Sequence, residues 1–232
     1  MKRFVIILMA LAVGLPISAQ QTCPDSNHPH AIDLGLPSGT KWACCNVGAS
    51  KPTAYGNYYA WGETTTKANY DLDTYKWCKS KWNSEFEGHD YFYTKYCTDS
   101  EKGWNGFTDN KTTLDLEDDA AYVNWGDKWR MPTITEIQEL LDNTTSEWTT
   151  QNGVYGRKFT SKSNGNAVFL PAAGYRYGSR LRNQSTDGYY WSSSLSESGQ
   201  DFALYLSFDS GSQGTYGEDR YYGYSVRPVL RN

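Results

Sequence analysis

The chain has 232 residues, a formal net charge of −4 and an aromatic content of 16%. An acidic chain without a basic block is a poor candidate for nucleic-acid binding, and its Tyr and Trp content argues against a disordered chain. The length corresponds to one or two domains. We expect a single domain over residues 31–232, because no linker-like segment divides them.

The first 19 residues have the organisation of a signal peptide. Lys2 and Arg3 precede an apolar run over residues 4–14, and Ile17-Ser18-Ala19 offers a small-residue cleavage site. The run is too short to cross a bilayer as a helix, and no later segment approaches the roughly 20 apolar residues required. We predict cleavage after Ala19, a flexible segment over residues 20–30, and a secreted, periplasmic or cell-surface product without a transmembrane segment.

A first pair of short strands is predicted around a turn at Pro37-Ser38-Gly39, in AIDLGLPSGTKWACCNVGA, and an aromatic strand follows in YGNYYAWGE. Residues 71–109 form an irregular, charged and aromatic segment, which we expect at the surface. It contains Cys78 and Cys97, which end the similar sequences TYKWC and YTKYC. With five cysteines in an exported chain, one or two disulfides and an odd thiol are expected. Spacing does not fix the connectivity, but we favour a Cys78–Cys97 bridge.

Two helices are predicted in the middle of the chain. A shorter one lies in LEDDAAYVNW, where the acidic run over residues 117–119 favours a solvated helix start. A calcium site there is a less favoured alternative, and no cofactor or metal is expected. The longer helix starts at Thr133, which forms a capping box with Glu136. Four apolar residues then recur at helical spacing: Ile134, Ile137, Leu140 and Leu141.

Strand patterns return after the second helix. SEWTT and RKFTSK flank the turn-rich QNGVYG, and NAVFLPAAGYR and GYYWSSS follow as further strands. In DFALYLSFDSG, large apolar residues alternate with smaller ones and with Tyr205, so we expect Tyr205 to point outward. The residues therefore predict one α+β domain with short strands and two helices.

Six segments carry a resemblance to one known family: AIDLGLPSGTKWACCNVGA, YGNYYAWGE, DDAAYVNWGDKWRMPT, FLPAAGYR, GYYWSSS and RYYGYSVRPVL. From about Ala31 to Leu230 the chain resembles the Fibrobacter-type major paralogous domain. The resemblance implies an α+β, C-type-lectin-like fold of the formylglycine-generating-enzyme kind. In that fold the N- and C-terminal strands pair, the strands are short and mixed or antiparallel, two helices pack alongside, and a large loop-rich half presents a surface. The C-terminal pattern is also similar to the variable proteins of diversity-generating retroelements, which use this fold to display changeable residues.

Catalytic residues of the related classes are missing from the sequence. Formylglycine-generating enzymes hold copper with a C-terminal cysteine pair, but no cysteine follows Cys97. A Ser-His-Asp site needs a histidine near a serine, and none of the three histidines lies in the motif-rich half. The calcium-ligating motifs of C-type lectins, such as Glu-Pro-Asn, are also absent. We therefore expect a protein that is not an enzyme, and a calcium-independent carbohydrate-binding module is the alternative to a display function.

The C-terminal part has the composition of a binding surface. Between Gly174 and Gly223, 26 of 50 residues are Tyr, Ser or Gly and none is Lys. Antibody combining loops have this composition, because Tyr gives contact area at low entropic cost and Ser and Gly give adaptable hydrogen bonds. The alternative is an ordinary set of solvated loops. The strand over residues 225–230 is expected to anchor these loops to the core.

We predict a ligand-binding face for a protein or glycan partner outside the cell. Its expected members are Tyr177, Arg180, Arg182, Tyr189, Asp201, Tyr205, Asp209, Tyr216, Asp219, Tyr221 and Tyr224. Residues expected in the scaffold instead are Trp42, Trp61, Trp125, Trp129 and Trp191, which should be largely buried, and Arg130 and Arg227, which should bind carboxylates or carbonyls.

Overall fold

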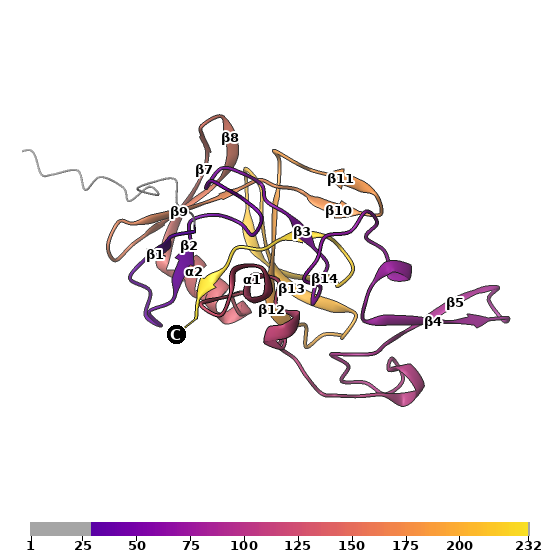
Figure 1. Ribbon diagram of the computed structural model, residues 1–232. Helices are drawn as coiled ribbons and strands as arrows, with labels where there is room; N and C mark the ends of the chain where they lie inside the picture. Colours follow the sequence, from indigo (N-terminus) through magenta and orange to yellow (C-terminus); the bar gives the residue numbers. More distant parts are fainter. Residues whose placement is uncertain (1–28, 232) are drawn as a thin grey trace, which may run out of the picture.

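The computed structural model describes residues 29–231, and Figure 1 shows the course of the chain. The predicted signal peptide, its cleavage site at Ala19 and Cys23 lie outside the described residues. Within the described part, no helix has the length and apolar character needed to cross a membrane.

A five-stranded sheet forms the centre of the fold. Its strands are arranged in the order β14-β13-β12-β15-β3. The strands β12 to β14 are consecutive and antiparallel, whereas β15 runs parallel to β12 and antiparallel to β3. The bounds are β3 (Tyr58–Tyr59), β12 (Gly188–Leu195), β13 (Phe202–Phe208), β14 (Gln213–Asp219) and β15 (Tyr224–Ser225).

A second sheet joins the two ends of the described chain. Its order is β1-β2-β16-β6, and Val229 pairs with both Trp42 and Arg130. The last strand therefore lies between a strand from the start of the chain and one from its middle. The bounds are β1 (Ala31–Asp33), β2 (Lys41–Ala43), β6 (Trp129–Arg130) and β16 (Val229–Leu230).

The two predicted α-helices are present and have side-chain caps. In α1 (Ala120–Trp125), the Asp119 carboxylate accepts hydrogen bonds from the first backbone N–H groups. In α2 (Ile134–Asn143), Thr133 and Glu136 form the expected capping box, and the buried residues Ile137 and Leu140 face the core. Both helix starts follow from the sequence, since a capping side chain precedes an apolar run in each.

Three smaller sheets complete the fold. β7 (Thr144–Gln151), β8 (Val154–Ser161) and β9 (Ala167–Pro171) form a meander, β10 (Tyr175–Tyr177) pairs with β11 (Arg180–Arg182), and β4 (Cys78–Asn83) pairs with β5 (Gly88–Tyr93). The β4–β5 hairpin projects from the body in Figure 1, with 3-10 turns at Leu72–Thr74 and Trp104–Gly106 before and after it. A third 3-10 turn, Leu116–Asp118, precedes α1.

The central sheet is buried on both faces. Leu206 and Phe208 of β13 belong to one core cluster with α2 and the meander, while Ala203 and Tyr205 of the same strand belong to a second cluster. Trp42, Trp61, Trp129 and Trp191 are buried as predicted, and Trp125 is partly buried against both clusters.

The predicted α+β, C-type-lectin-like fold is wrong. Strands dominate the described residues, and two short helices are the only α-helices among them. Much of the expected loop-rich half is β structure: β14 lies in the segment predicted as turns, and the β4–β5 hairpin in the segment predicted as an irregular excursion. The two Gly residues of β14 are tolerated because it is an edge strand that pairs on one side only.

The predicted Cys78–Cys97 bridge is also wrong. Neither cysteine forms a disulfide in the structure. Cys97 is fully buried, with its Sγ 3.1 Å from the Asp99 carbonyl oxygen, and Cys78 is half-buried on β4. Burial raises the pKa of the Cys78 thiol to about 11, so both side chains act as small packing residues.

The expected structural role of Arg130 and Arg227 is confirmed. Arg130 makes a two-pronged ion pair with Glu136, at 2.7 and 2.6 Å. Arg227 is buried and donates to the Asn46 side chain and to two backbone carbonyls, those of Ala43 and Phe169. Neither guanidinium is therefore available to a ligand.

Candidate functional site

A layer of tyrosine rings covers one end of the central sheet. We call the partly or well exposed rings the tyrosine surface; Trp191, Tyr205 and Tyr224 form its buried base. The members of the tyrosine surface are Tyr175, Tyr177, Tyr189, Tyr216, Tyr221 and Tyr222.

The sheet register places these rings on one face. Trp191, Tyr205 and Tyr216 are direct cross-strand neighbours on β12, β13 and β14, and Tyr189 lies two residues before Trp191. Residues that oppose one another across an antiparallel pair share a face, so the three strands contribute to one aromatic layer. The ring centroids of Tyr205 and Tyr216 are 6.1 Å apart.

The β10–β11 hairpin and the segment before β15 extend the layer. Tyr175 contacts Tyr189 at 5.0 Å between centroids, and Tyr222 stacks on Tyr177 at 5.0 Å and on Tyr221 at 5.1 Å. The rings from Tyr221 to Tyr216 thus form an unbroken series of contacts across five segments of the chain. Each such contact contributes about 0.5–1.5 kcal/mol beyond the burial of apolar area.

Two arginines border the layer. Tyr177 pairs with Arg180 and Tyr175 with Arg182 across the β10–β11 hairpin, so all four side chains share a face. The Arg182 guanidinium lies 5.6 Å from the centroid of the Tyr177 ring. Both arginines are exposed, and they are the cationic part of the surface.

Three hydroxyl groups of the tyrosine surface have a raised pKa, those of Tyr189, Tyr221 and Tyr222. Burial raises the pKa of Tyr222 to about 12 and also raises that of Tyr189. The pKa of Tyr221 is raised by burial and by its hydrogen bond to Asp219, to which it donates over 2.9 Å. These three side chains therefore offer neutral hydroxyl groups beside their aromatic rings.

The structure brings most of the predicted site residues together but buries two of them. Tyr205 is 7% exposed and Tyr224 is 2% exposed, so the prediction that they lie on an exposed face is wrong. Period-two alternation indicates an outward face only when one side of a sheet is solvated, and this sheet is covered on both sides. The two rings support the surface from below.

Two predicted acidic residues have other surroundings. Asp209 closes the turn between β13 and β14 by accepting from the backbone N–H groups of Gly211 and Ser212, which lowers its pKa. Asp201 forms an ion pair with Lys102 at 3.2 Å and lines a groove beside the tyrosine surface. Asp219 lines the same groove and joins it to the tyrosine surface through Tyr221.

Sequence reasoning missed Tyr175 and Tyr222, although Tyr175 contacts three of the rings named above and Tyr222 contacts four. Tyr175 lies two residues before the predicted Tyr177, and the β-strand period would have placed the two on one face. Tyr222 follows Tyr221 directly, and nothing in the sequence YYGY indicates which of these two side chains belongs to the surface.

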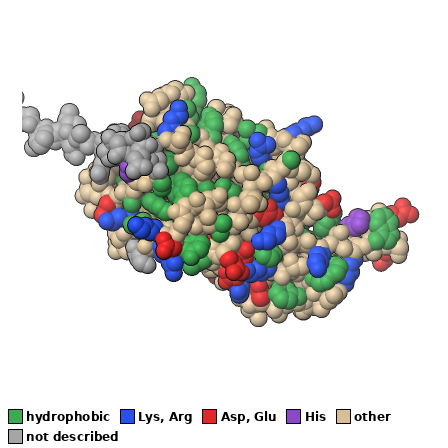
Figure 2. All heavy atoms as spheres, in the orientation of Figure 1, with side chains coloured by type: hydrophobic (Ala, Val, Ile, Leu, Met, Phe, Trp, Pro, Cys, Tyr) green, Lys and Arg blue, Asp and Glu red, His purple; other side chains and the backbone are tan. Residues whose placement is uncertain are grey.

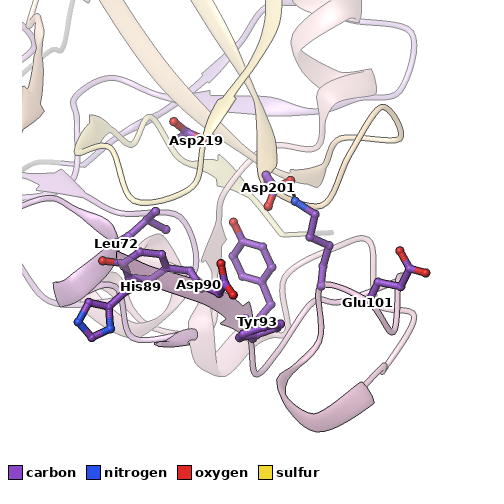
Figure 3. A pocket seen from close by; sticks show the side chains of 10 residues that line it. Leu72, His89, Asp90, Tyr93, Glu101, Asp201 and Asp219 are labelled. Atoms are coloured by element: carbon purple, nitrogen blue, oxygen red, sulfur yellow. Dashed lines mark hydrogen bonds and ion pairs between the residues drawn. The ribbon is translucent and has the colours of Figure 1, made fainter. Parts of the chain in front are cut away.

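The groove has a volume of about 470 Å³. Figure 3 shows Asp201 and Asp219 above it, His89 and Asp90 of β5 below it, and the Tyr93 ring between them. The remaining lining residues are Leu72, Tyr91, Phe92, Glu101 and Lys102.

The acidic residues before α1 have cationic partners of their own. Asp115, Glu117 and Asp118 lie close together, but Lys95 Nζ approaches all three carboxylates, at 2.7, 3.2 and 2.6 Å. The expected solvated helix start is wrong for Asp118 and Asp119, which are both buried. The ammonium group of Lys95 therefore compensates the charge of these three carboxylates.

The model of a family described as a domain of unknown function (DUF8237) matches residues 145–229, which contain β8 to β15 and all six members of the tyrosine surface. No curated protein and no solved structure matches the chain.

Proposed function

We propose that the protein is a secreted binding protein without catalytic activity, and that its tyrosine surface binds a protein ligand. The observation that carries the proposal is the layer of partly exposed tyrosines, which is continuous from Tyr221 to Tyr189, reaches Tyr216 through the buried Tyr205, and is bordered by Arg180 and Arg182. Tyr and Arg are the residues that concentrate binding energy in protein interfaces.

The ring arrangement favours a protein over a glycan. Tyr177, Tyr221 and Tyr222 stack on one another with interplanar angles of 20° and 24°. Sugar rings bind on open aromatic faces, and mutual stacking covers part of those faces. A protein ligand can use ring edges, hydroxyls and the neighbouring guanidinium groups instead.

The buried base explains how such a surface can be held in place. Tyr224 stacks on Trp191 at 4.3 Å, and Trp191 donates its indole N–H to the Tyr59 carbonyl oxygen. A rigid base reduces the entropy lost on binding, because fewer side chains have to be immobilised. A buried base beneath exposed rings also supports the prediction that the C-terminal strands anchor a binding surface.

A random peptide library displayed on phage tests the proposal, because interface hot spots select peptides preferentially. Peptides selected on the full mature chain should bind at least about tenfold more weakly to Tyr177→Ala/Tyr216→Ala. Both rings are well exposed, at 41% and 52%, so this variant should fold normally.

The matched control is Tyr155→Ala. This ring is similarly exposed and stacks on Trp148, but it lies on the β7–β8 hairpin. Peptides that are insensitive to Tyr177→Ala/Tyr216→Ala contradict the proposal. A different outcome is that xylan, mannan or pectin retards the wild-type chain in affinity electrophoresis but not the same variant. That result would mean that the ligand is a glycan and not a protein.

A further inference from the structure

We propose that the groove beside the tyrosine surface is a second binding site, in which an extended basic peptide adds a strand to the open edge of β5. This site does not depend on the proposed function of the tyrosine surface. It rests on the groove itself, on the hydrogen-bonding direction of β5 and on the charges that line the groove.

The first observation is the open edge of β5. Within residues 29–231 its sheet has two strands, β4 and β5. The edge of β5 that faces away from β4 carries a single bridge, between Tyr93 and Gly103. The remaining edge borders the groove, which is lined by five consecutive residues of β5, His89 to Tyr93. In Figure 1 the hairpin stands away from the body, and Figure 2 shows hydrophobic side chains at its projecting end.

The second observation is the direction of the peptide groups. The Tyr93 N–H points away from β4, because it donates to the Lys102 carbonyl oxygen at 2.8 Å. Along an antiparallel strand the peptide groups alternate in direction, so those of Tyr91 and His89 also point to the groove side. An added strand binds to such groups by main-chain hydrogen bonds.

The third observation is the charge of the groove. Four carboxylates line it, those of Asp90, Glu101, Asp201 and Asp219, against one ammonium group, that of Lys102. Burial and the nearby carboxylate of Asp201 raise the pKa of Asp219, although Asp219 also accepts a hydrogen bond from the Tyr221 hydroxyl. A cationic side chain placed between Asp201 and Asp219 would relieve this repulsion.

The partner is therefore a peptide segment with Lys or Arg at alternate positions. Residues two apart in a strand share a side, so alternate cations can reach the carboxylates while the main chain pairs with β5. The groove also contains Leu72, Phe92 and the Tyr93 ring, which can contact the aliphatic parts of Lys or Arg.

The test uses a blocked synthetic peptide of alternating Lys and Thr, measured by isothermal titration calorimetry on the full mature chain. Asp201→Asn/Asp219→Asn should weaken its binding at least about tenfold. The charge control, Asp142→Asn/Glu147→Gln, removes two exposed carboxylates on α2 and β7 and should leave the affinity unchanged. A peptide of alternating Glu and Thr should not bind.

Strand addition is tested separately. His89→Pro removes an N–H that points to the groove, whereas Ser80→Pro removes one on the opposite edge of the hairpin, because Ser80 pairs with Tyr91. Binding should be lost in His89→Pro and kept in Ser80→Pro, with circular dichroism confirming that both variants fold. Absence of binding to the wild type, equal binding of the acidic peptide, or unchanged binding by His89→Pro would each overturn the proposal.

Discussion

Tyr205 and Tyr216 are cross-strand neighbours of the same type, and their surroundings differ completely. Tyr205 lies between Trp191, Tyr189 and Tyr224 and is 7% exposed, whereas Tyr216 lies on the edge strand and is 52% exposed. The residue type alone therefore does not separate a supporting tyrosine from one that a ligand can reach. The position of the strand in the sheet separates them, because β13 lies between two neighbouring strands and β14 lies at the edge.

Substitution of these two residues should have different consequences for stability. Tyr205→Ala should lower the free energy of unfolding by about 3–5 kcal/mol, because it leaves a cavity in a packed core. Tyr216→Ala should lower it by less than about 1 kcal/mol. Urea denaturation followed by Trp fluorescence measures both. Equal losses of unfolding free energy in the two variants would mean that the buried base and the exposed rings contribute to stability in the same way.

Glu136 should give the protein an acid-sensitive part of its stability. Burial alone would raise the pKa of this carboxyl, but its bonds with Arg130, Thr133 and Thr40 outweigh burial and hold the pKa below its ordinary value of 4.5. The folded chain then binds fewer protons than the unfolded chain. The contribution of Glu136 is therefore present above pH 4.5 and is lost as the pH falls through the lowered pKa.

The matched variant is Glu136→Gln. At neutral pH it should be less stable than the wild type by about 1.5–3 kcal/mol, because a hydrogen bond between charged groups is lost. The difference should shrink as the pH is lowered below 4.5. Chemical denaturation at a series of pH values measures this difference, and a constant gap would show that the ion pair does not contribute through its charge.

At the scale of elements, the sequence was most informative where local chemistry is decisive. A capping box and apolar spacing located α2, and an acidic run indicated the start of α1. Asn152 and Gly153, both with positive φ, connect β7 and β8 at the predicted turn. β14 and the β4–β5 hairpin could not be predicted in this way. Their polar and Gly-containing sequences become strands because a partner strand satisfies their peptide groups.

The cap of α1 also connects two elements. Asp119 accepts from Ala121 and Tyr122 at the start of the helix and, over 2.7 Å, from the N–H of Met131, which directly follows β6. Asp119→Ala should lower the free energy of unfolding by about 2–4 kcal/mol, because the cap is lost and a buried N–H is left unpaired.

Asp119→Asn separates these two contributions. Its amide oxygen can still cap the helix, but its NH₂ group cannot accept from Met131, so an intermediate loss is expected. Thermal unfolding of the wild type and both variants gives the order. A loss in Asp119→Asn equal to that in Asp119→Ala would place the whole effect in the contact with Met131.

At the scale of the whole molecule, the C-terminal segment connects the two core clusters. Val226 belongs to the cluster under the tyrosine surface, Val229 belongs to the cluster with α2, and Arg227 between them binds Ala43, Asn46 and Phe169. This segment directly follows the rings of Tyr221, Tyr222 and Tyr224. The sequence predicted an anchor beside a variable surface, and the contacts made by Arg227 show how the anchor is held.

The contacts of this segment came from residues that are distant in sequence, and for that reason they could not be predicted. Arg227 and Asn46 are 181 positions apart. The prediction of the site failed for the same reason. Asp209 was grouped with the tyrosines by composition, but its carboxylate accepts hydrogen bonds from the backbone of its own turn. Which polar residues remain available to a ligand depends on contacts that no local pattern records.

Removal of the segment should therefore prevent folding of the whole domain. A chain that ends at Gly223 lacks β15, β16 and Arg227, so the carbonyl oxygens of Ala43 and Phe169 lose a buried charged donor, at about 1.5–3 kcal/mol for each such bond. A chain that ends at Leu230 keeps all of these contacts and is the matched control. Near-ultraviolet circular dichroism and a cooperative thermal transition should be present in the control and absent in the shorter chain. A cooperative transition in the chain that ends at Gly223 would show that the two core clusters hold together without the C-terminal segment.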